Sequence, residues 1–306
     1  MQKLLGNQIK PGGYVLNTHS VCAVIVTYHP TAEMVANLYK TRAQVQGMVV
    51  VDNGSSPEEL LPLRQAASEL SYRLIENGEN LGIAEALNRG VKWAKEQGFP
   101  LVILFDQDSK ITEGFVGAML ETWESHPHRE KIASLHPRYV DPGADREPHI
   151  KRAADGGPFV SITSGALMPT WIFDRIGYFI SEYFMDHVDT EYSLRIRAAG
   201  YTIADSREAV LIHTVGHSKY AFLLGFRFRP TYHYVGQRYY VTRNRIVTYR
   251  KYFTIFPAWV LGAAYAAVRE TAKSLIAEED RTRRFRNLLL GVWDGLNGRM
   301  GKRTGI

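Results

Sequence analysis

Short apolar runs alternate with amphipathic stretches over the first half of the chain. Four runs are typical of buried strands: 21–27, 48–52, 72–77 and 101–105. Between them, apolar residues recur at helical spacing and predict helices over 31–45, from Pro57 onward, and over 83–97. Strands that alternate with helices in this way indicate an α/β fold, in which helices cover both faces of a parallel sheet.

Polar residues follow each predicted strand. The four exits read Thr27-Tyr28-His29, Asp52-Asn53-Gly54-Ser55-Ser56, Glu76-Asn77 and Asp106-Gln107-Asp108. Because the carboxyl ends of parallel strands meet at one edge of a sheet, these side chains should converge where α/β sheets bind ligands. Such an edge suits a ligand with several hydrogen-bonding parts, for example a nucleotide. The glycines spell neither a P-loop nor the G-x-G-x-x-G fingerprint, which argues against simple kinase and dehydrogenase functions.

Two acids, Asp106 and Asp108, end the fourth strand in LVILFDQDS. Carboxylates at close range repel each other unless a cation lies between them. A capping loop is the alternative, with Ser109 or Thr112 as the N-cap of a helix over 113–126. A cap explains one polar residue but not both acids, and this stretch by itself leaves both interpretations open.

The motifs, taken in order, resemble a known enzyme family. They are VIVTYHP, VVDNGSS, ENLGIAEALNRG, FDQDS, TSGALM and FMDHVDTEYSLRIRAAGY. This order resembles the inverting GT-A glycosyltransferases of family 2. The DQDS form with the later D-x-x-D-x-E-Y is most similar to the bacterial rhamnosyltransferases of that family. The resemblance covers about residues 20–250 and implies a GT-A core, an α/β fold with a mixed sheet and flanking helices.

The resemblance also implies a nucleotide-sugar site at the strand exits. Asp52 matches the residue that contacts the pyrimidine base, since a carboxylate accepts the N3–H of thymine or uracil. A tight turn before a helix is the alternative for Asp52. The other implied donor-binding residues are Thr27, Tyr28, Asn80, Gly82, Asn88, Asp106, Gln107, Ser164, Gly165 and Arg243. For Arg243, the alternative is a basic helix on a membrane surface.

A divalent cation, Mg²⁺ or Mn²⁺, is implied as the cofactor. By resemblance, Asp108 holds the metal against the donor diphosphate. Asp106 lies nearer the ribose and is a second candidate metal ligand. Hard cations take carboxylate oxygens and stabilise the charge of a departing diphosphate. His213 begins an H-x-x-G-x-S pattern whose histidine can reach the metal or diphosphate. A lone histidine after a short strand is also compatible with a structural role.

Three acids, Asp186, Asp189 and Glu191, lie close together before and within a predicted helix that starts near Thr190. Aligned with the family pattern E-D-x-D-L-x-x-R, Asp189 falls on the catalytic aspartate and Glu191 on the following acid. Val188 replaces the common glutamate. Inverting transfer needs one base for the acceptor hydroxyl, so we expect Asp189 to be that base, with Asp186 in reserve. The alternative is that these acids only stabilise the helix N-terminus through its positive dipole, which accounts for one of the three.

Composition and charge limit the cellular compartment and the partners that the chain can be expected to have. The chain has 306 residues, a net charge of +6 and a pI near 9.2. Its single cysteine, Cys22, lies in an apolar run, which excludes a disulfide framework and indicates a core thiol in a reducing compartment. Residues 1–19 contain no stretch typical of a signal peptide, and we expect a loosely packed leader there. No nucleic-acid motif accompanies the basic segment 281–287, so we expect no nucleic-acid partner.

The expected domains are the leader 1–19, a GT-A domain over 20–250, and a helical, basic region over 251–306. The apolar stretch 255–268 has 14 residues, fewer than the roughly 20 that span a bilayer. Its aromatic and basic flanks suit a helix on an anionic membrane surface. A helix in a homo-oligomer contact, or one packed against the main domain, is the alternative.

The predicted function is transfer of L-rhamnose from dTDP-β-L-rhamnose, with inversion, to a lipid-linked or polymeric saccharide acceptor. This would serve bacterial cell-surface polysaccharide synthesis of the O-antigen kind, in the cytoplasm at the inner face of the membrane. Two alternatives stay open. One is a family 2 transferase that uses UDP-galactofuranose or a UDP-hexose. The other is a non-catalytic nucleotide-sugar-binding subunit of a glycan assembly complex.

Overall fold

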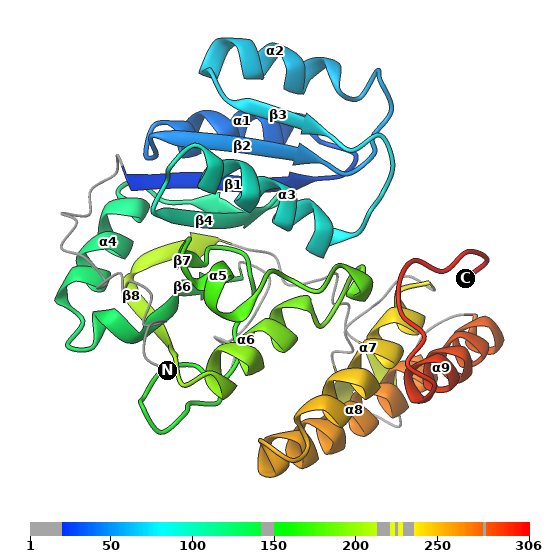
Figure 1. Ribbon diagram of the computed structural model, residues 1–306. Coiled ribbons are helices and arrows are strands. Elements are labelled where there is room, and N and C mark those ends of the chain that lie inside the picture. The colour runs from blue at the N-terminus through cyan, green and yellow to red at the C-terminus, as the bar shows by residue number, and fades with distance from the viewer. Residues whose placement is uncertain (1–19, 142–149, 213–220, 224–225, 229–235, 278–279) are drawn as a thin grey trace, which may run out of the picture.

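The computed structural model describes residues 20–141, 150–212, 221–223, 226–228, 236–277 and 280–306. Its main feature is an eight-stranded sheet (Figure 1) in the order β3-β2-β1-β4-β7-β6-β8-β5. The strands, in chain order, are β1 (Val21–Thr27), β2 (Gly47–Asp52), β3 (Arg73–Glu76), β4 (Leu101–Asp106), β5 (Lys110–Ile111), β6 (Ile132–Val140), β7 (Leu167–Pro169) and β8 (Thr202–Ile212). A separate antiparallel pair joins β9 (Ala221–Leu223) and β10 (Phe226–Phe228).

The four strands predicted from the sequence form the parallel half of this sheet. β1 pairs in parallel with β2 on one side and β4 on the other, and β2 pairs with β3. The other half is mixed, because β7 runs antiparallel to β4 and β6, whereas β6 and β8 are parallel. The exits of β1, β2 and β4 therefore meet at one edge, as expected.

Helices cover both faces of the sheet (Figure 1). On one face the core includes α1 (Ala32–Arg42), α2 (Leu61–Leu70) and α4 (Phe115–Ser125). On the other it includes α3 (Ile83–Glu96), α5 (Ile172–Ile176) and α6 (Val188–Ala198). Cys22 is fully buried in the second core, and burial raises its pKa to about 12, so it is the core thiol expected.

Two predicted helix starts are wrong. Pro57 does not open a helix, because residues 57–60 form a turn and α2 begins at Leu61. α4 begins after Gly114, which adopts a left-handed φ of +71° without a side-chain cap. The two proposed caps are engaged elsewhere: the Ser109 hydroxyl bonds Ser164, and the Thr112 hydroxyl donates to the carbonyl of Val210. The capping-loop alternative for the end of β4 is therefore wrong.

Three helices follow the sheet: α7 (Gln237–Tyr252), α8 (Pro257–Ala277) and α9 (Arg281–Leu296). α7 and α9 lie side by side (Figure 1). They approach closely because α9 presents Gly291 and Gly295, where an added Cβ would come within 3 Å of backbone oxygens of Tyr239 and Arg243. The domain boundary expected at residue 250 thus falls inside α7, a helix that packs against α9.

The apolar stretch 255–268 lies mostly in α8. Trp259 and Val260 are buried in a small core with Leu194 of α6, whereas Leu261 and Tyr265 are exposed. One side of the stretch therefore packs against the main domain. No helix in the described part of the chain is long and apolar enough to cross a membrane.

Candidate active site

The exits of β1 and β4 are joined by the glutamine between the two acids. The hydroxyl of Thr27 donates to Gln107 Oε1 at 2.9 Å, and the backbone N–H of Tyr28 donates to the same oxygen at 3.0 Å. Thr27 is buried, while Tyr28 is 41% exposed at the sheet edge. Gln107 therefore fixes the loop that carries Asp106 and Asp108 against β1.

Asp52 lies at the exit of β2, and its side chain is engaged in a tight turn. Its Oδ2 accepts the N–H groups of Gly54 and Ser55, both at 2.9 Å, and its Oδ1 accepts the Ser55 hydroxyl at 2.5 Å. Asp52 is fully buried. This is the turn that was the alternative to base recognition. A base edge could bind Asp52 only if Ser55 moved aside or the remaining acceptor position on Oδ1 became accessible.

The loop before α3 is held by a pair of asparagines. Asn53 donates to Asn80 Oδ1 at 3.1 Å and accepts the N–H of Leu81 at 3.0 Å. Gly82 has φ of +88°, and an added Cβ would clash with the backbone of Phe184. Asn80 and Gly82 thus lie beside the β2 exit and contact the segment that leads into the three acids.

Asn88 does not face this edge. It is buried, and its amide donates to the Phe179 carbonyl at 2.8 Å while its Oδ1 accepts the Phe179 N–H at 3.0 Å. Both ends of the side chain are thus used to attach α3 to the 179–181 segment. The expectation that Asn88 contacts the nucleotide is corrected to a role in packing.

The Ser164-Gly165 loop packs directly behind the acids at the end of β4. The hydroxyls of Ser109 and Ser164 are 2.5 Å apart, and the Gly165 N–H donates to the Leu104 carbonyl at 2.6 Å. The hydroxyl of Tyr139 donates to the Ser164 carbonyl at 2.9 Å. The loop therefore lies beside the end of β4, and its contact with the donor stays a prediction.

Tyr139 lies within electrostatic range of two acids, Asp106 and Asp189, that are 83 positions apart in the sequence. Burial is the main cause that raises the pKa of Tyr139, and the charges of both Asp106 and Asp189 raise it further. Both carboxylates therefore lie within electrostatic range of one phenol. Tyr139 was not singled out from the sequence, because a tyrosine in a strand gives no signal of its own.

The donor set at the end of β4 fits a divalent cation that is completed by a substrate. Asp106 is half-buried and Asp108 is exposed two residues later, so both supply hard oxygen ligands at the sheet edge. No group of three or more histidine, cysteine or acidic ligands occurs among the described residues. One or two carboxylates plus substrate phosphates is the arrangement in which proteins usually bind Mg²⁺. His213 lies outside the described residues.

Two acids flank the start of α6 in a strained turn. Phe184, Asp186 and His187 all have left-handed φ angles, between +57° and +64°. Such angles cost energy for non-glycine residues and concentrate at functional sites. Burial and the neighbouring Asp189 raise the pKa of Asp186 to about 6, although a hydrogen bond from Gln237 opposes the shift.

Asp189, at the first turn of α6, is also an unusual carboxylate. Burial raises its pKa, while hydrogen bonds from the N–H and hydroxyl of Thr190 to Oδ1 partly counter the shift. Among the described residues, Asp186 Oδ2 and His187 Nδ1 are buried with no hydrogen-bond partner. A raised pKa is typical of carboxylates that exchange protons, so both aspartates are suited to act as a base.

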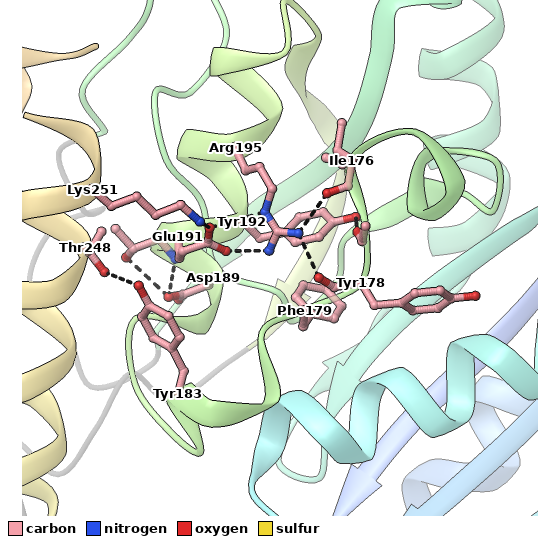
Figure 2. Close-up of polar contacts among 12 residues, drawn as sticks. Ile176, Tyr178, Phe179, Tyr183, Asp189, Glu191, Tyr192, Arg195, Thr248 and Lys251 are labelled. Atoms are coloured by element: carbon pink, nitrogen blue, oxygen red, sulfur yellow. Dashed lines mark hydrogen bonds and ion pairs between the residues drawn. The ribbon is translucent and has the colours of Figure 1, made fainter. Parts of the chain in front are cut away.

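Glu191, the third acid, has a different environment (Figure 2). It is 1% exposed, and it accepts from Arg195 at 2.5 Å and from Lys251 at 2.7 Å. It also accepts the Tyr252 hydroxyl at 2.8 Å. Burial alone raises its pKa, but Arg195 and Lys251 outweigh burial and hold the pKa below the ordinary value. Arg195 in turn donates to the carbonyls of Ile176 and Tyr178. The structure thus corrects the catalytic expectation for Glu191, whose carboxylate joins α6 to α7.

We expect Glu191→Gln to lower the free energy of unfolding by about 3 kcal/mol, because it leaves Arg195 buried without its counter-charge. Denaturant unfolding at pH 7 measures this, and the loss should shrink as pH falls through the lowered pKa of Glu191, where the parent also loses the ion pair. Glu208→Gln, at an exposed position of β8, is the matched control. An unchanged stability for Glu191→Gln would contradict this structural role.

Arg243 is also corrected by the structure. It is fully buried, and its guanidinium donates to the carbonyls of Gly301 at 2.5 Å and Tyr183 at 3.1 Å. The adjacent Asn244 donates to the carbonyls of Met185 at 2.6 Å and Asp186 at 2.9 Å. This pair therefore fixes the segment that carries Asp186, and the Arg243 guanidinium is buried on backbone carbonyls instead of exposed on a basic helix surface.

Residues 22–185, more than half of the chain, match the family described as glycosyl transferase family 2. The chain belongs to glycosyl transferase family 2. It is 25% identical over 299 residues to "dTDP-rhamnosyl transferase RfbF" of Shigella flexneri, covering 92% of this chain and 97% of that protein. It is 24% identical to "Low-salt glycan biosynthesis hexosyltransferase Agl10" of Haloferax volcanii, over 68% of this chain and 73% of that one.

Solved structures confirm the GT-A fold of this family 2 glycosyltransferase. S. aureus TarS 1-349 superposes with a TM-score of 0.61 at 14% identity, covering 91% of this chain and 81% of that one. The mannosyltransferase PcManGT from Pyrobaculum calidifontis, solved with GDP-Man and Mn²⁺, superposes with a TM-score of 0.55 at 17% identity, over 94% and 91% of the two chains.

Proposed function

We propose that this glycosyltransferase transfers L-rhamnose from dTDP-β-L-rhamnose, with inversion, to a saccharide acceptor of a bacterial cell-surface polysaccharide. The observation that carries the proposal is that Asp106 and Asp189 both lie within electrostatic range of Tyr139, while Gln107 joins the exits of β1 and β4. We therefore assign the donor-binding edge and the candidate base to one site. The Shigella flexneri relative, which aligns along nearly its full length, supports rhamnose as the sugar.

In the proposed reaction, an acceptor hydroxyl attacks the anomeric carbon of the sugar from the face opposite the diphosphate. Asp189 takes the hydroxyl proton, the new glycosidic bond forms, and the bond to dTDP breaks with its electron pair on the phosphate oxygen. A base with a raised pKa holds the proton more readily than an ordinary aspartate. The Tyr139 hydroxyl donates to the Ser164 carbonyl, and the Ser164 hydroxyl bonds Ser109, so this loop is attached to the chain that follows Asp108.

Asp108 and Asp106 would hold the divalent cation. When bound, a Mg²⁺ or Mn²⁺ ion neutralises charge on the donor diphosphate. Support comes from the residues at the end of β4 and from structural neighbours solved with Mn²⁺, including GalNAc-T7 with UDP and GalNAc at a TM-score of 0.58.

Nucleotide preference tests the donor assignment. We expect dTDP and UDP to bind at least about tenfold more tightly than GDP and ADP, because the N3–H of thymine or uracil can donate to the Asp52 carboxylate once Ser55 moves aside. Tenfold corresponds to one well-made contact. Calorimetry with the four diphosphates in the presence of Mg²⁺ or Mn²⁺ measures this. Equal affinity for all four would overturn the pyrimidine site.

The choice of sugar is tested by turnover. Purified protein is incubated with dTDP-rhamnose, UDP-galactofuranose and a UDP-hexose, and release of the nucleoside diphosphate is followed. We expect release from dTDP-rhamnose only. Release from a UDP-sugar would favour the alternative donor. Tight binding without release or transfer would favour a non-catalytic binding subunit.

A further inference from the structure

α9 carries a row of large apolar side chains on its outer side. Phe285, Leu289, Trp293 and Leu296 are between 51% and 60% exposed. Their spacing of four, four and three residues places them on one face of the helix. We call these four residues the α9 stripe. They line one shallow hollow together with Thr282, Arg286, Leu290 and Val292.

The opposite side of α9 is fully used inside the protein. Asn287 and Asp294 are 1% exposed, and Gly291 and Gly295 contact the backbone of α7. Asp294 accepts the hydroxyl of Tyr239 at 2.7 Å. These inner contacts fix the orientation of α9, and they keep the α9 stripe on the outer side of the helix.

The stripe is set in the most basic part of the chain. Residues 281–306 contain seven basic side chains and one acid, so their net charge equals the +6 of the whole chain. Arg286 lines the same hollow as the stripe, and Arg283 is exposed three residues before it. Arginines beside a row of exposed apolar side chains are complementary to a surface that is anionic outside and apolar beneath.

We propose that α9 binds the surface of an anionic lipid bilayer, with the α9 stripe in the interfacial region and the arginines on the headgroups. Amphipathic helices with this division of side chains lie in the plane of the interface. Each arginine near an anionic leaflet strengthens the attachment. The helix lies on the membrane and does not cross it, because its 16 residues are fewer than the roughly 20 that span a bilayer.

A second copy of this chain fits the stripe less well. Two α9 helices would bring two strongly basic segments together, and the exposed acid next to them, Asp280 at the N-cap, lies outside the α9 stripe. The one carboxylate within α9, Asp294, is buried and bonded to Tyr239 and Arg303. A symmetric contact would therefore bring like charges close together while it buries the apolar row.

The helix that carries the proposed membrane face is linked to the candidate active site through α7. α9 packs on α7, and α7 holds the Asp186 segment through Asn244. In Figure 1 the carboxyl ends of β1, β2 and β3 point toward the side of the molecule where α7 and α9 lie. The inference goes beyond the proposed function and does not depend on it, since a membrane contact is compatible with any acceptor.

Vesicle flotation with the full chain tests the proposal. One set of vesicles contains phosphatidylcholine alone, and the other contains about 30% phosphatidylglycerol. We expect the protein to float with the anionic vesicles only, and to release as salt is raised. Leu289→Glu should lower the partition coefficient by about tenfold or more, since it removes an inserted apolar side chain. Arg283→Ala and Arg286→Ala should each lower it by about fivefold.

Matched controls separate this effect from general damage. Leu61→Glu changes an equally exposed leucine on α2, and Arg207→Ala changes an exposed arginine on β8. Both should float like the parent, and every variant should keep the parent's melting temperature. The proposal is overturned if the parent floats with neither set, or if Leu289→Glu floats as well as Leu61→Glu. If the parent stays unbound and is a dimer that Leu289→Glu converts to a monomer, the α9 stripe is instead a contact between copies.

Discussion

Asp189→Asn is expected to lower kcat by about 10² to 10⁴, which is the usual contribution of a positioned base. Asparagine preserves size and can still hydrogen-bond an acceptor hydroxyl, but it cannot accept the proton when the hydroxyl attacks. Because this interaction is made only in the transition state, the affinity for dTDP-sugar should change little. Steady-state transfer assays combined with donor calorimetry measure both quantities.

The matched variant is Asp186→Asn, three residues earlier. We expect it to keep transfer within about tenfold of the parent. Its own signature is stability. Burial raises the pKa of Asp186 to about 6, so the charged form destabilises the folded state above that pH. Asp186→Asn should therefore melt at a higher temperature than the parent at about pH 8, and the difference should vanish below about pH 4.

The pH dependence of the rate provides a further check. Because burial raises the pKa of Asp189, transfer should fall on the acid side at a pH above the ordinary range for aspartate. If Asp186→Asn abolishes transfer and Asp189→Asn leaves it intact, the two roles must be exchanged. The unpaired Oδ2 of Asp186 and its pKa near 6 make that outcome chemically sensible.

Asp108→Asn should have the second large effect. It retains shape at the end of β4 but removes one of the two charges that fit a divalent cation. We expect the affinity for Mn²⁺ together with dTDP to fall by at least about tenfold, and turnover to fall by about 10² or more. Calorimetry of Mn²⁺ binding in the presence of dTDP gives a readout that does not depend on catalysis.

Asp174→Asn is the control for this change, since Asp174 is an exposed aspartate on α5 that pairs with Lys95 away from the site. It should bind metal and donor as the parent does. The metal requirement itself is tested with excess EDTA, which should stop transfer. Full activity in EDTA, or unchanged Mn²⁺ affinity in Asp108→Asn, would refute the assignment.

Much of the fold was predictable because its signal is local. β1, β2 and β4 lie inside the sheet with both faces covered, so each is a continuous apolar run. The polar exits then had to meet at one edge, because the strands are parallel. By contrast, the start of α4 was wrong. A left-handed glycine begins that helix, and the two expected caps bond to Ser164 and Val210, which are distant in the sequence.

The sequence by itself determined the parallel half of the sheet and the loop that carries Asp106 and Asp108, and its resemblance to the family predicts Asp189 as the base. Only the tertiary structure separated Glu191 from Asp189, two residues apart in one helix. Glu191 pairs with Lys251, which helps to hold the pKa of Glu191 below its ordinary value, whereas burial raises the pKa of Asp189. The same holds for Arg243, whose guanidinium is used by backbone carbonyls rather than by a ligand. Strand and helix patterns follow from neighbours in the chain, but the charge state of a buried group follows from whatever the fold packs against it.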